Sequence, residues 1–229
     1  TLSLQPLEKR QIRELDNFFL MQNYEPKWNL ITRIFEDRTV IESKSYKYLL
    51  KNINRLSKFG YTFLSISSLY GQNTIVKYLI DSGADPSIIN SQGVTPLHSA
   101  STEYIVYKLA ENGCDVNQQD SYGNTAIMFA SYKGLKDVVL TLIKVGANLN
   151  TKNNKGQTAL MLACNYDKLD VIETLLENNA EINYVDNNGN NAFHYACMNN
   201  LKIIIKYFYN KNIDLNLQNN EGDTPAHLI

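Results

Sequence analysis

The residues that could do chemistry are three histidines and three cysteines. His194 and Cys197 lie three residues apart, a spacing that puts two side chains on adjacent surface of a helix. A catalytic thiol also needs a base that takes its proton and a site that holds the oxyanion. Cys164 occupies the place equivalent to Cys197 in another copy of the repeat described below, as expected of a small buried residue. We therefore expect this pair to serve packing and the chain to be non-catalytic.

Other patterns that carry chemistry are missing from the sequence. It holds neither four clustered Cys and His ligands nor an H-E-x-x-H pair, so we expect no metal. It also holds no G-x-x-x-x-G-K-[ST] phosphate loop, G-x-S-x-G elbow or kinase signature, and no cofactor is expected. Cys114, Cys164 and Cys197 cannot all pair and lack C-x-x-C spacing, which favours a reducing compartment.

Charge and hydropathy restrict the class of partner. Lys and Arg number 22 and Asp and Glu 23, giving a net charge of −1 in 229 residues. A general nucleic-acid binder needs a basic face, and an acidic membrane needs a basic block, so neither partner is expected. Mean hydropathy is −0.31, and no apolar run approaches the roughly 18 residues that span a membrane. We expect a folded, monomeric, cytoplasmic protein whose natural chain extends beyond this sequence.

A repeat organises most of the chain. Glycines stand at 60, 93, 123, 156, 189 and 222, spaced by 33, 30, 33, 33 and 33 residues. Similar phrases follow them: G-V-T-P-L-H-S-A, G-N-T-A-I-M-F-A, G-Q-T-A-L-M-L-A, G-N-N-A-F-H-Y-A and G-D-T-P-A-H-L, with G-Y-T-F-L-S-I-S as a looser first copy. They resemble the ankyrin repeat, with its T-P-L-H-x-A phrase and 33-residue period. The resemblance implies an all-α solenoid of helix-turn-helix units with short β-hairpin loops over residues 60–229.

The repeat also agrees with backbone physics. The threonine two residues after a glycine can cap a first helix, and Pro96 and Pro225 suit the first helical position. Residues that tolerate a left-handed backbone fall where each helix should end. They are Gly71, Gly134, Asp167 and Asn200 after the first helices, and Gly83, Gly113, Gly146, Asn179 and Asn212 after the second. Asn90, Asp120, Asn153, Asp186 and Asn219 fit side-chain-capped hairpin turns.

The histidines share one repeat position, the fifth after each glycine. His98, His194 and His227 stand there, and Met128 and Met161 replace them in two other copies. Methionine does no acid–base work, so the resemblance implies a scaffold role. The repeat at Gly93 lacks three residues after His98, which predicts a shortened turn between its helices.

Residues 1–59 lack the repeat in register. Apolar stripes predict one helix around Ile12 to Phe19 and a second around Trp28 to Phe35. The clearest stripe runs from Tyr46 to Leu56. We interpret the segment as a helical cap on the first repeat, because solenoid ends need covering. A separate functional domain is the alternative.

The family resemblance places a partner on the concave face, formed by hairpin tips and first helices. The residues that the repeat register puts there, and that we predict to bind, are Tyr61, Tyr70, Tyr122, Asn124, Tyr132, Lys133, Lys155, Gln157, Tyr166 and Met198. Packing does not require aromatic residues at these positions, and tyrosine suits protein interfaces. The alternative is that tyrosine is simply common, at 15 of 229 residues.

The predicted function is recognition of a protein or peptide by a preorganised surface, as an adaptor or scaffold. Two other functions stay open. The chain could be the targeting arm of a larger enzyme, or of a pathogen effector that acts in the host cytosol. It could also be a spacer with no partner of its own.

Overall fold

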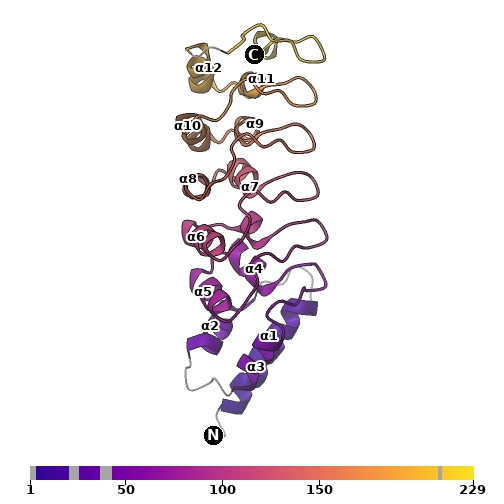
Figure 1. The fold of residues 1–229 in the computed structure, drawn as a ribbon, viewed down its shortest axis with the longest axis vertical. Coiled ribbons are helices and arrows are strands. Elements are labelled where there is room, and N and C mark those ends of the chain that lie inside the picture. The colour runs from indigo at the N-terminus through magenta and orange to yellow at the C-terminus, as the bar shows by residue number, and fades with distance from the viewer. Residues whose placement is uncertain (1–3, 21–25, 37–42, 211–212) are drawn as a thin grey trace. The chain divides into compact units, whose positions relative to one another are not determined.

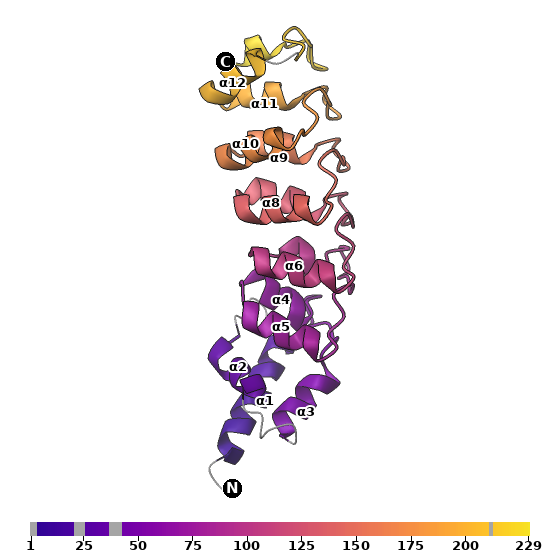
Figure 2. The same cartoon turned by 60° about the vertical axis from the view of Figure 1, so that its left-hand side comes forward.

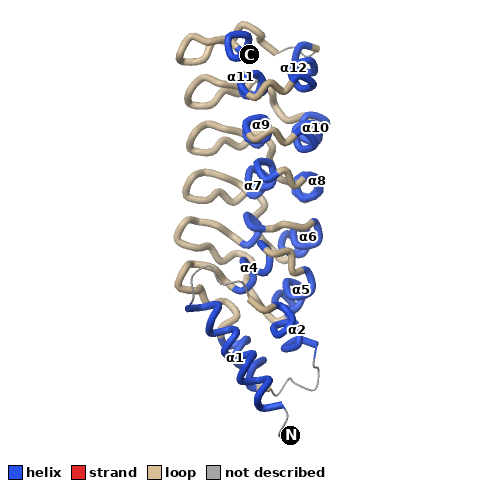
Figure 3. The backbone as a smooth tube through the Cα atoms, turned by 180° about the vertical axis from the view of Figure 1, so that it is seen from behind, coloured by secondary structure: helices blue, strands red, loops and turns tan. Residues whose placement is uncertain are grey.

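The computed structural model describes residues 4–20, 26–36, 43–210 and 213–229. This part of the chain is helical and contains no strand (Figure 3). The chain divides into two compact units, Thr1–Cys114 and Asp115–Ile229. The predicted boundary at residue 60 lies inside the first unit and stays a prediction.

The first unit contains six α-helices and one 3-10 helix within its described residues. In chain order they are α1 Leu4–Leu20, α2 Trp28–Glu36, α3 Lys44–Lys51, α4 Phe63–Leu69, α5 Asn73–Asp81, η2 Pro96–Ser99 and α6 Glu103–Glu111 (Figure 1). The sequence predicted α1 and α2 well, whereas α3 ends before Ile53 and Leu56. Leu56 is exposed, so only the first half of that stripe is helical.

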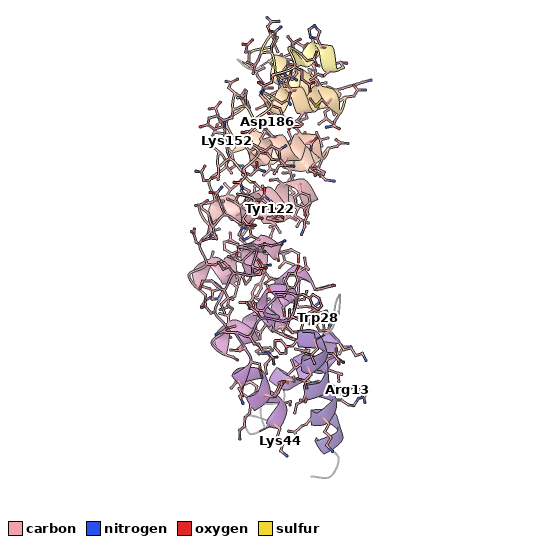
Figure 4. All side chains as sticks on the ribbon, turned by 90° about the vertical axis from the view of Figure 1, so that its right-hand side faces the viewer. Arg13, Trp28, Lys44, Tyr122, Lys152 and Asp186 are labelled. Atoms are coloured by element: carbon pink, nitrogen blue, oxygen red, sulfur yellow. The ribbon has the colours of Figure 1, made fainter. Side chains whose placement is uncertain are left out.

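The N-terminal helices cover the first repeat. Leu15 and Phe18 of α1 and Ile31 of α2 are buried. The Phe18 ring meets the ring of Phe63, the first residue of α4, edge-on at 4.7 Å between centroids. Trp28, labelled in Figure 4, packs against the same ring at 6.3 Å. These contacts place α1 and α2 against the first repeat. The assignment of residues 1–59 as a capping segment stays a prediction.

The shortened repeat loses its first helix rather than only its turn. The other complete repeats begin with an α-helix of seven or eight residues, whereas this one has the four-residue η2. Ser101 then donates a hydrogen bond from its hydroxyl to the carbonyl of Ser68 in the preceding repeat, at 3.0 Å. The prediction of a shortened turn was therefore incomplete, because the three-residue deletion also shortens the first helix.

The second unit contains three complete repeats and the start of another. Its elements are α7 Ala126–Lys133, α8 Lys136–Lys144, α9 Ala159–Asn165, α10 Leu169–Glu177, α11 Ala192–Met198, α12 Lys202–Tyr209 and η3 Pro225–Leu228. The first helices α7, α9 and α11 lie side by side (Figure 1), and α8 lies beside α10 (Figure 2). Buried Ala130, Ala163 and Ala196 let the first helices approach closely.

The left-handed corners lie where the sequence predicted them. Gly71, Gly134, Asp167 and Asn200 all have positive φ after a first helix. Gly83, Gly113, Gly146 and Asn179 do so after a second helix, and Asn212 lies outside the described residues. Gly and Asn tolerate this backbone region best, which is why these residue types recur at the helix ends.

The loops of the second unit project from one side of its helix pairs (Figure 1). Each predicted hairpin is a turn held by one side chain and not a pair of strands. The Asn153 Oδ1 accepts the backbone N–H groups of Lys155 at 3.0 Å and Gln157 at 2.9 Å. Asp120 and Asp186 do the same in the neighbouring repeats. The prediction of side-chain-capped turns is confirmed.

An asparagine ladder, consisting of Asn154, Asn187 and Asn220, joins successive hairpin tips. The backbone N–H of Asn187 donates to the carbonyl of Lys155 at 3.0 Å, and its side-chain amide donates to the carbonyl of Asn154 at 2.9 Å. Asn154 and Asn220 each make the same two bonds to the preceding hairpin. Each tip is therefore fixed to the next by two hydrogen bonds.

Glycine is required beneath the ladder. Gly156 has φ +77°, and a Cβ built on it would lie 2.7 Å from Asn187 Oδ1 and 2.8 Å from the Asn187 backbone nitrogen. Gly123 meets Asn154 in the same way. A side chain at either position would push the hairpins apart.

We expect Gly156→Ala to destabilise the protein more than Gly146→Ala does. Both glycines have positive φ, so both variants bear the ~1–2 kcal/mol cost of a left-handed L-residue. Nothing lies within 4 Å of a Cβ at Gly146, so only the Gly156 variant also breaks the hairpin contact. Urea denaturation followed by circular dichroism measures both losses. Equal losses would show that the contact between hairpins contributes nothing.

A buried amide in the fifth repeat is mismatched with its histidine. His194 Nδ1 accepts the backbone N–H of Asn191 at 3.2 Å, so it has no proton for Asn191 Oδ1, which lies 2.8 Å away. Flipping the amide would instead face its NH₂ toward the backbone N–H of His194, now bonded to Oδ1 at 3.0 Å. The buried Nδ2 has no partner within the described residues.

We expect Asn191→Thr to stabilise the protein by about 1 kcal/mol, because it removes an unpaired buried donor. A threonine hydroxyl can accept from the backbone N–H of His194 and donate to its Nδ1 at the same time. The equivalent pair in the second repeat shows this arrangement, with 2.9 Å between Thr95 Oγ1 and His98 Nδ1. Thermal unfolding should show a midpoint higher by about 2–4 °C. Thr158→Asn is the matched control. It should lower the midpoint, because Met161 has no ring nitrogen that could accept a hydrogen bond from the new buried amide. A lower midpoint for Asn191→Thr would contradict the argument.

Candidate protein-binding surface

The histidines hold the scaffold together. His194 is fully buried, and its Nε2 donates to the carbonyl of Asp223 in the next repeat at 3.3 Å. His98 Nδ1 accepts the backbone N–H of Thr95 at 3.1 Å, and His227 bonds Thr224 in the same way at 3.2 Å. Met128 and Met161, at the equivalent position, are buried. The predicted scaffold role of this position is thus confirmed.

The His194 and Cys197 pair is not arranged for nucleophilic catalysis. Both ring nitrogens of His194 already hold backbone groups of Asn191 and Asp223. Burial raises the pKa of the Cys197 thiol to about 11 and that of Cys164 further still, so both thiols stay protonated at neutral pH. Neither sulfur is accessible, which agrees with the packing role that the sequence predicted.

The described residues form neither a cluster of metal ligands nor a membrane-spanning helix. Across residues 4–20, 26–36, 43–210 and 213–229, no three His, Cys, Asp or Glu side chains come together as metal ligands would. In the same ranges, no helix combines the length and apolar character needed to cross a bilayer.

A pocket in the second unit gathers residues predicted to bind a partner. It has a volume of about 380 Å³ and lies between the third and fourth repeats. Six predicted residues line it: Tyr122, Asn124, Tyr132, Lys155, Gln157 and Tyr166. They come from two hairpins and from the C-terminal ends of α7 and α9. Figure 4 labels Tyr122 on its hairpin.

Tyrosine rings form the walls of this tyrosine pocket. The ring of Tyr132 lies between Phe129 and Tyr166, at centroid distances of 5.9 Å and 5.5 Å. The interplanar angles of 56° and 49° are tilted arrangements that leave ring faces open. Tyr122 is 60% exposed and Tyr166 52% exposed, unusually high for aromatic side chains in a folded protein. These rings are available to a partner.

The lining of the tyrosine pocket includes residues that are not among those predicted to bind a partner. Phe129, Met128 and Leu162 line it, together with Asn153 and Asn154. Phe129 and Leu162 occupy the variable position of the repeated phrase, between the His or Met and the Ala. Its occupant changes from Ser99 to Phe129, Leu162 and Tyr195, whereas the residue after it is alanine in all four copies. That variability was the available signal.

The amides of the tyrosine pocket are held in place by neighbouring repeats. Asn153 donates from Nδ2 to Asn124 Oδ1 at 3.0 Å. Gln157 donates from Nε2 to the Tyr195 hydroxyl at 2.9 Å, and that hydroxyl donates to Asp186 Oδ2 at 2.7 Å. Burial and the Asp186 carboxylate raise the pKa of Tyr195 to about 12, so the hydroxyl remains a donor. The pocket walls are therefore preorganised.

Four predicted residues lie outside the tyrosine pocket. Lys133 and Met198 are exposed on α7 and α11 of the same unit and do not line it. Tyr61 and Tyr70 belong to the first unit, where the Tyr70 ring packs 5.8 Å from the ring of Trp28. These four residues stay predictions of a wider binding surface.

Repeated helix pairs and stacked hairpins define an α-helical repeat protein. Family models described as ankyrin repeats in three copies match residues 40–120 and 101–186, and one described as ankyrin repeats in many copies matches 180–229. The chain therefore belongs to the ankyrin-repeat family. The first match begins upstream of the repeat that we recognised at Gly60.

Curated relatives match parts of the chain. A palmitoyltransferase AKR1 of Lachancea kluyveri is 33% identical over 36% of this chain and 12% of its own length. The inactive serine/threonine-protein kinase TEX14 of Bos taurus is 32% identical over 36% of the chain and 6% of its own length. A putative ankyrin repeat protein FPV230 of fowlpox virus is 48% identical over 20% of the chain and 24% of its own length. The chain thus spans a quarter or less of these relatives.

We expect His194→Met to reduce the loss of stability on acidification from pH 7 to pH 5. Burial lowers the pKa of His194, so the unfolded chain takes up a proton near pH 6.5 before the folded protein does. The protein therefore loses stability as the pH falls below the pKa of this histidine in the unfolded chain. Methionine has no proton to take up and already fills this position in two repeats.

Thermal midpoints of both proteins at pH 7, 6 and 5 provide the measurement. The variant should show the smaller decline, whatever its stability at pH 7. An equal decline in both proteins would mean that His194 protonation does not limit the acid stability of the fold.

Proposed function

We propose that the chain is a non-catalytic recognition module that binds a protein or peptide through the concave face of its repeats. Ankyrin repeats are generally protein–protein interaction modules, which supports the class of function. The observation that carries the proposal is the tyrosine pocket. Exposed Tyr122 and Tyr166 line it together with the half-buried Tyr132, on walls fixed by neighbouring repeats. A rigid aromatic surface loses little conformational entropy on binding, so its contact area converts well into affinity.

A specific observation favours the targeting arm of a larger protein as the second candidate. The palmitoyltransferase and the inactive kinase match this chain over 12% or less of their own lengths, so similar repeats occur as small parts of large proteins. Under this proposal the same concave face would bring a partner to a separate domain. A role as a pathogen effector would use the surface in the same way.

We expect the Tyr122→Ala, Tyr132→Ala and Tyr166→Ala changes each to weaken partner binding by more than ~1 kcal/mol, as truncation of aromatic interface residues does. Peptides selected from a displayed library on the 229-residue chain, and then measured by isothermal titration calorimetry, provide the test. Circular dichroism should show that the variants stay folded, because Tyr122 and Tyr166 are largely exposed.

A matched control replaces Tyr104 and Tyr107, which are exposed on α6 of the first unit and outside the predicted surface. Their loss should leave affinity unchanged. If the three pocket variants bind every selected peptide like the parent, the concave face is not the binding surface.

A further inference from the structure

We propose that the tyrosine pocket takes an aromatic side chain of the partner that is flanked by a carboxylate, so that the partner is an acidic peptide segment with an aromatic anchor. This inference rests on the proposed function, since it names the chemistry of the ligand that the same surface binds. Three features of the pocket lead to it: its apolar floor, the donors left open on its walls, and its charge.

The size and floor of the pocket suit a ring. Phe129 and Leu162 form an apolar base, and a volume of about 380 Å³ lies at the small end of ligand pockets. The tilted rings of Tyr132 and Tyr166, 5.5 Å apart, leave ring edges and faces that a further aromatic group can meet. One large side chain fits this space better than an extended backbone does.

Lys155 is the polar group of the pocket that most restricts the ligand. The amide nitrogens of Asn153 and Gln157 already donate to Asn124 and Tyr195. The hydroxyls of Tyr122, Tyr132 and Tyr166 and the ammonium of Lys155 have no hydrogen-bond or ion-pair partner among the described residues. Hydroxyls can also accept, whereas an ammonium only donates. A ligand that satisfies Lys155 must therefore carry an acceptor, and an anionic acceptor gives the stronger bond.

Among the described residues, the one charged side chain that lines the pocket is a cation. Lys155 lines it, and no carboxylate of the described residues does. The nearby Asp120 is buried, and its Oδ1 accepts the backbone N–H groups of Tyr122 and Asn124. Asp167 follows Tyr166 but does not line the pocket. A cationic ligand would find ring faces here, but it would also meet Lys155 without a compensating carboxylate.

Three small indoles that differ in charge test the proposal. N-acetyltryptophan carries a carboxylate, N-acetyltryptophanamide is neutral and tryptamine is cationic at pH 7. Titrated into the ¹⁵N-labelled 229-residue chain, each reports its affinity through the side-chain amide signals of Asn124 and Gln157. We expect N-acetyltryptophan to bind about three- to fivefold more tightly than the neutral amide, the range of a partly exposed ion pair, and tryptamine to bind most weakly.

Lys155→Gln should reduce the affinity for N-acetyltryptophan to that for the neutral amide and leave the neutral amide unaffected. Lys136→Gln is the matched control, because Lys136 is an exposed lysine of the same repeat that does not line the pocket. It should leave all three affinities unchanged. A loss of carboxylate preference that is equal in both variants would reflect general charge and would overturn the role of Lys155.

The other outcomes also decide the matter. Tightest binding of tryptamine would assign the pocket to a cationic ligand, and equal binding of all three would make it a simple apolar site; either result overturns the proposal. Absence of binding by all three overturns it as well. The proposed function fails separately, when peptides selected on the chain do not depend on the three tyrosines.

Discussion

The close approach of successive hairpins is the constraint on which the rest of the second unit depends. Gly123, Gly156 and Gly189 each turn a hairpin with positive φ, and the space that a Cβ would fill is occupied by an asparagine of the next repeat. Because that asparagine donates to two carbonyls of the hairpin before it, the distance between repeats is set at the tips as well as between helices. The carbonyls of Tyr122 and Lys155 are among the acceptors. The same contact that stacks the repeats therefore positions the walls of the tyrosine pocket.

At this surface the polar groups serve the structure and the aromatic rings are open to a ligand. Amides and carboxylates of the hairpins bond to each other, as in the chain of Gln157, Tyr195 and Asp186, and these bonds leave them little capacity for a ligand. Among the described residues, the hydroxyls of Tyr122 and Tyr166 make no such bonds, and both side chains stay exposed. A surface built this way is rigid because its polar groups are satisfied internally, and it can bind because its rings are not covered. Tyr195 shows the distinction, since its hydroxyl is used for structure and its side chain is buried.

The period and the residue types at special backbone positions made much of the fold predictable. Glycine and asparagine with positive φ, the turns capped by Asn153 and its equivalents, and the scaffold histidines all follow from local physics that repeats with the sequence. Register alone also brought together Tyr122, Tyr132 and Tyr166. Register did not identify Phe129 and Leu162, because the prediction took only outward-facing positions of the first helices, and these two side chains are half-buried and buried. Nor could it show that the deleted residues shorten a helix, since the length of η2 depends on packing between repeats that spacing does not report.

Asparagine is abundant, at 29 of 229 residues, and the structure separates the asparagines that have a structural role from those that reflect only a compositional bias. Some asparagines stand at positions that few other residue types could fill. Asn154, Asn187 and Asn220 each donate two hydrogen bonds to the preceding hairpin. Asn179 and Asn200 adopt the left-handed backbone conformation. Asn191 shows the opposite case. It stands where threonine occurs in most copies and leaves a buried amide nitrogen unpaired. A bias toward asparagine alone would fill both kinds of position, whereas selection for the ladder accounts only for the first. The asparagines between the hairpins therefore help to hold the repeats together. The fold tolerates the mismatched Asn191, because the adjacent His194 still bonds to the next repeat.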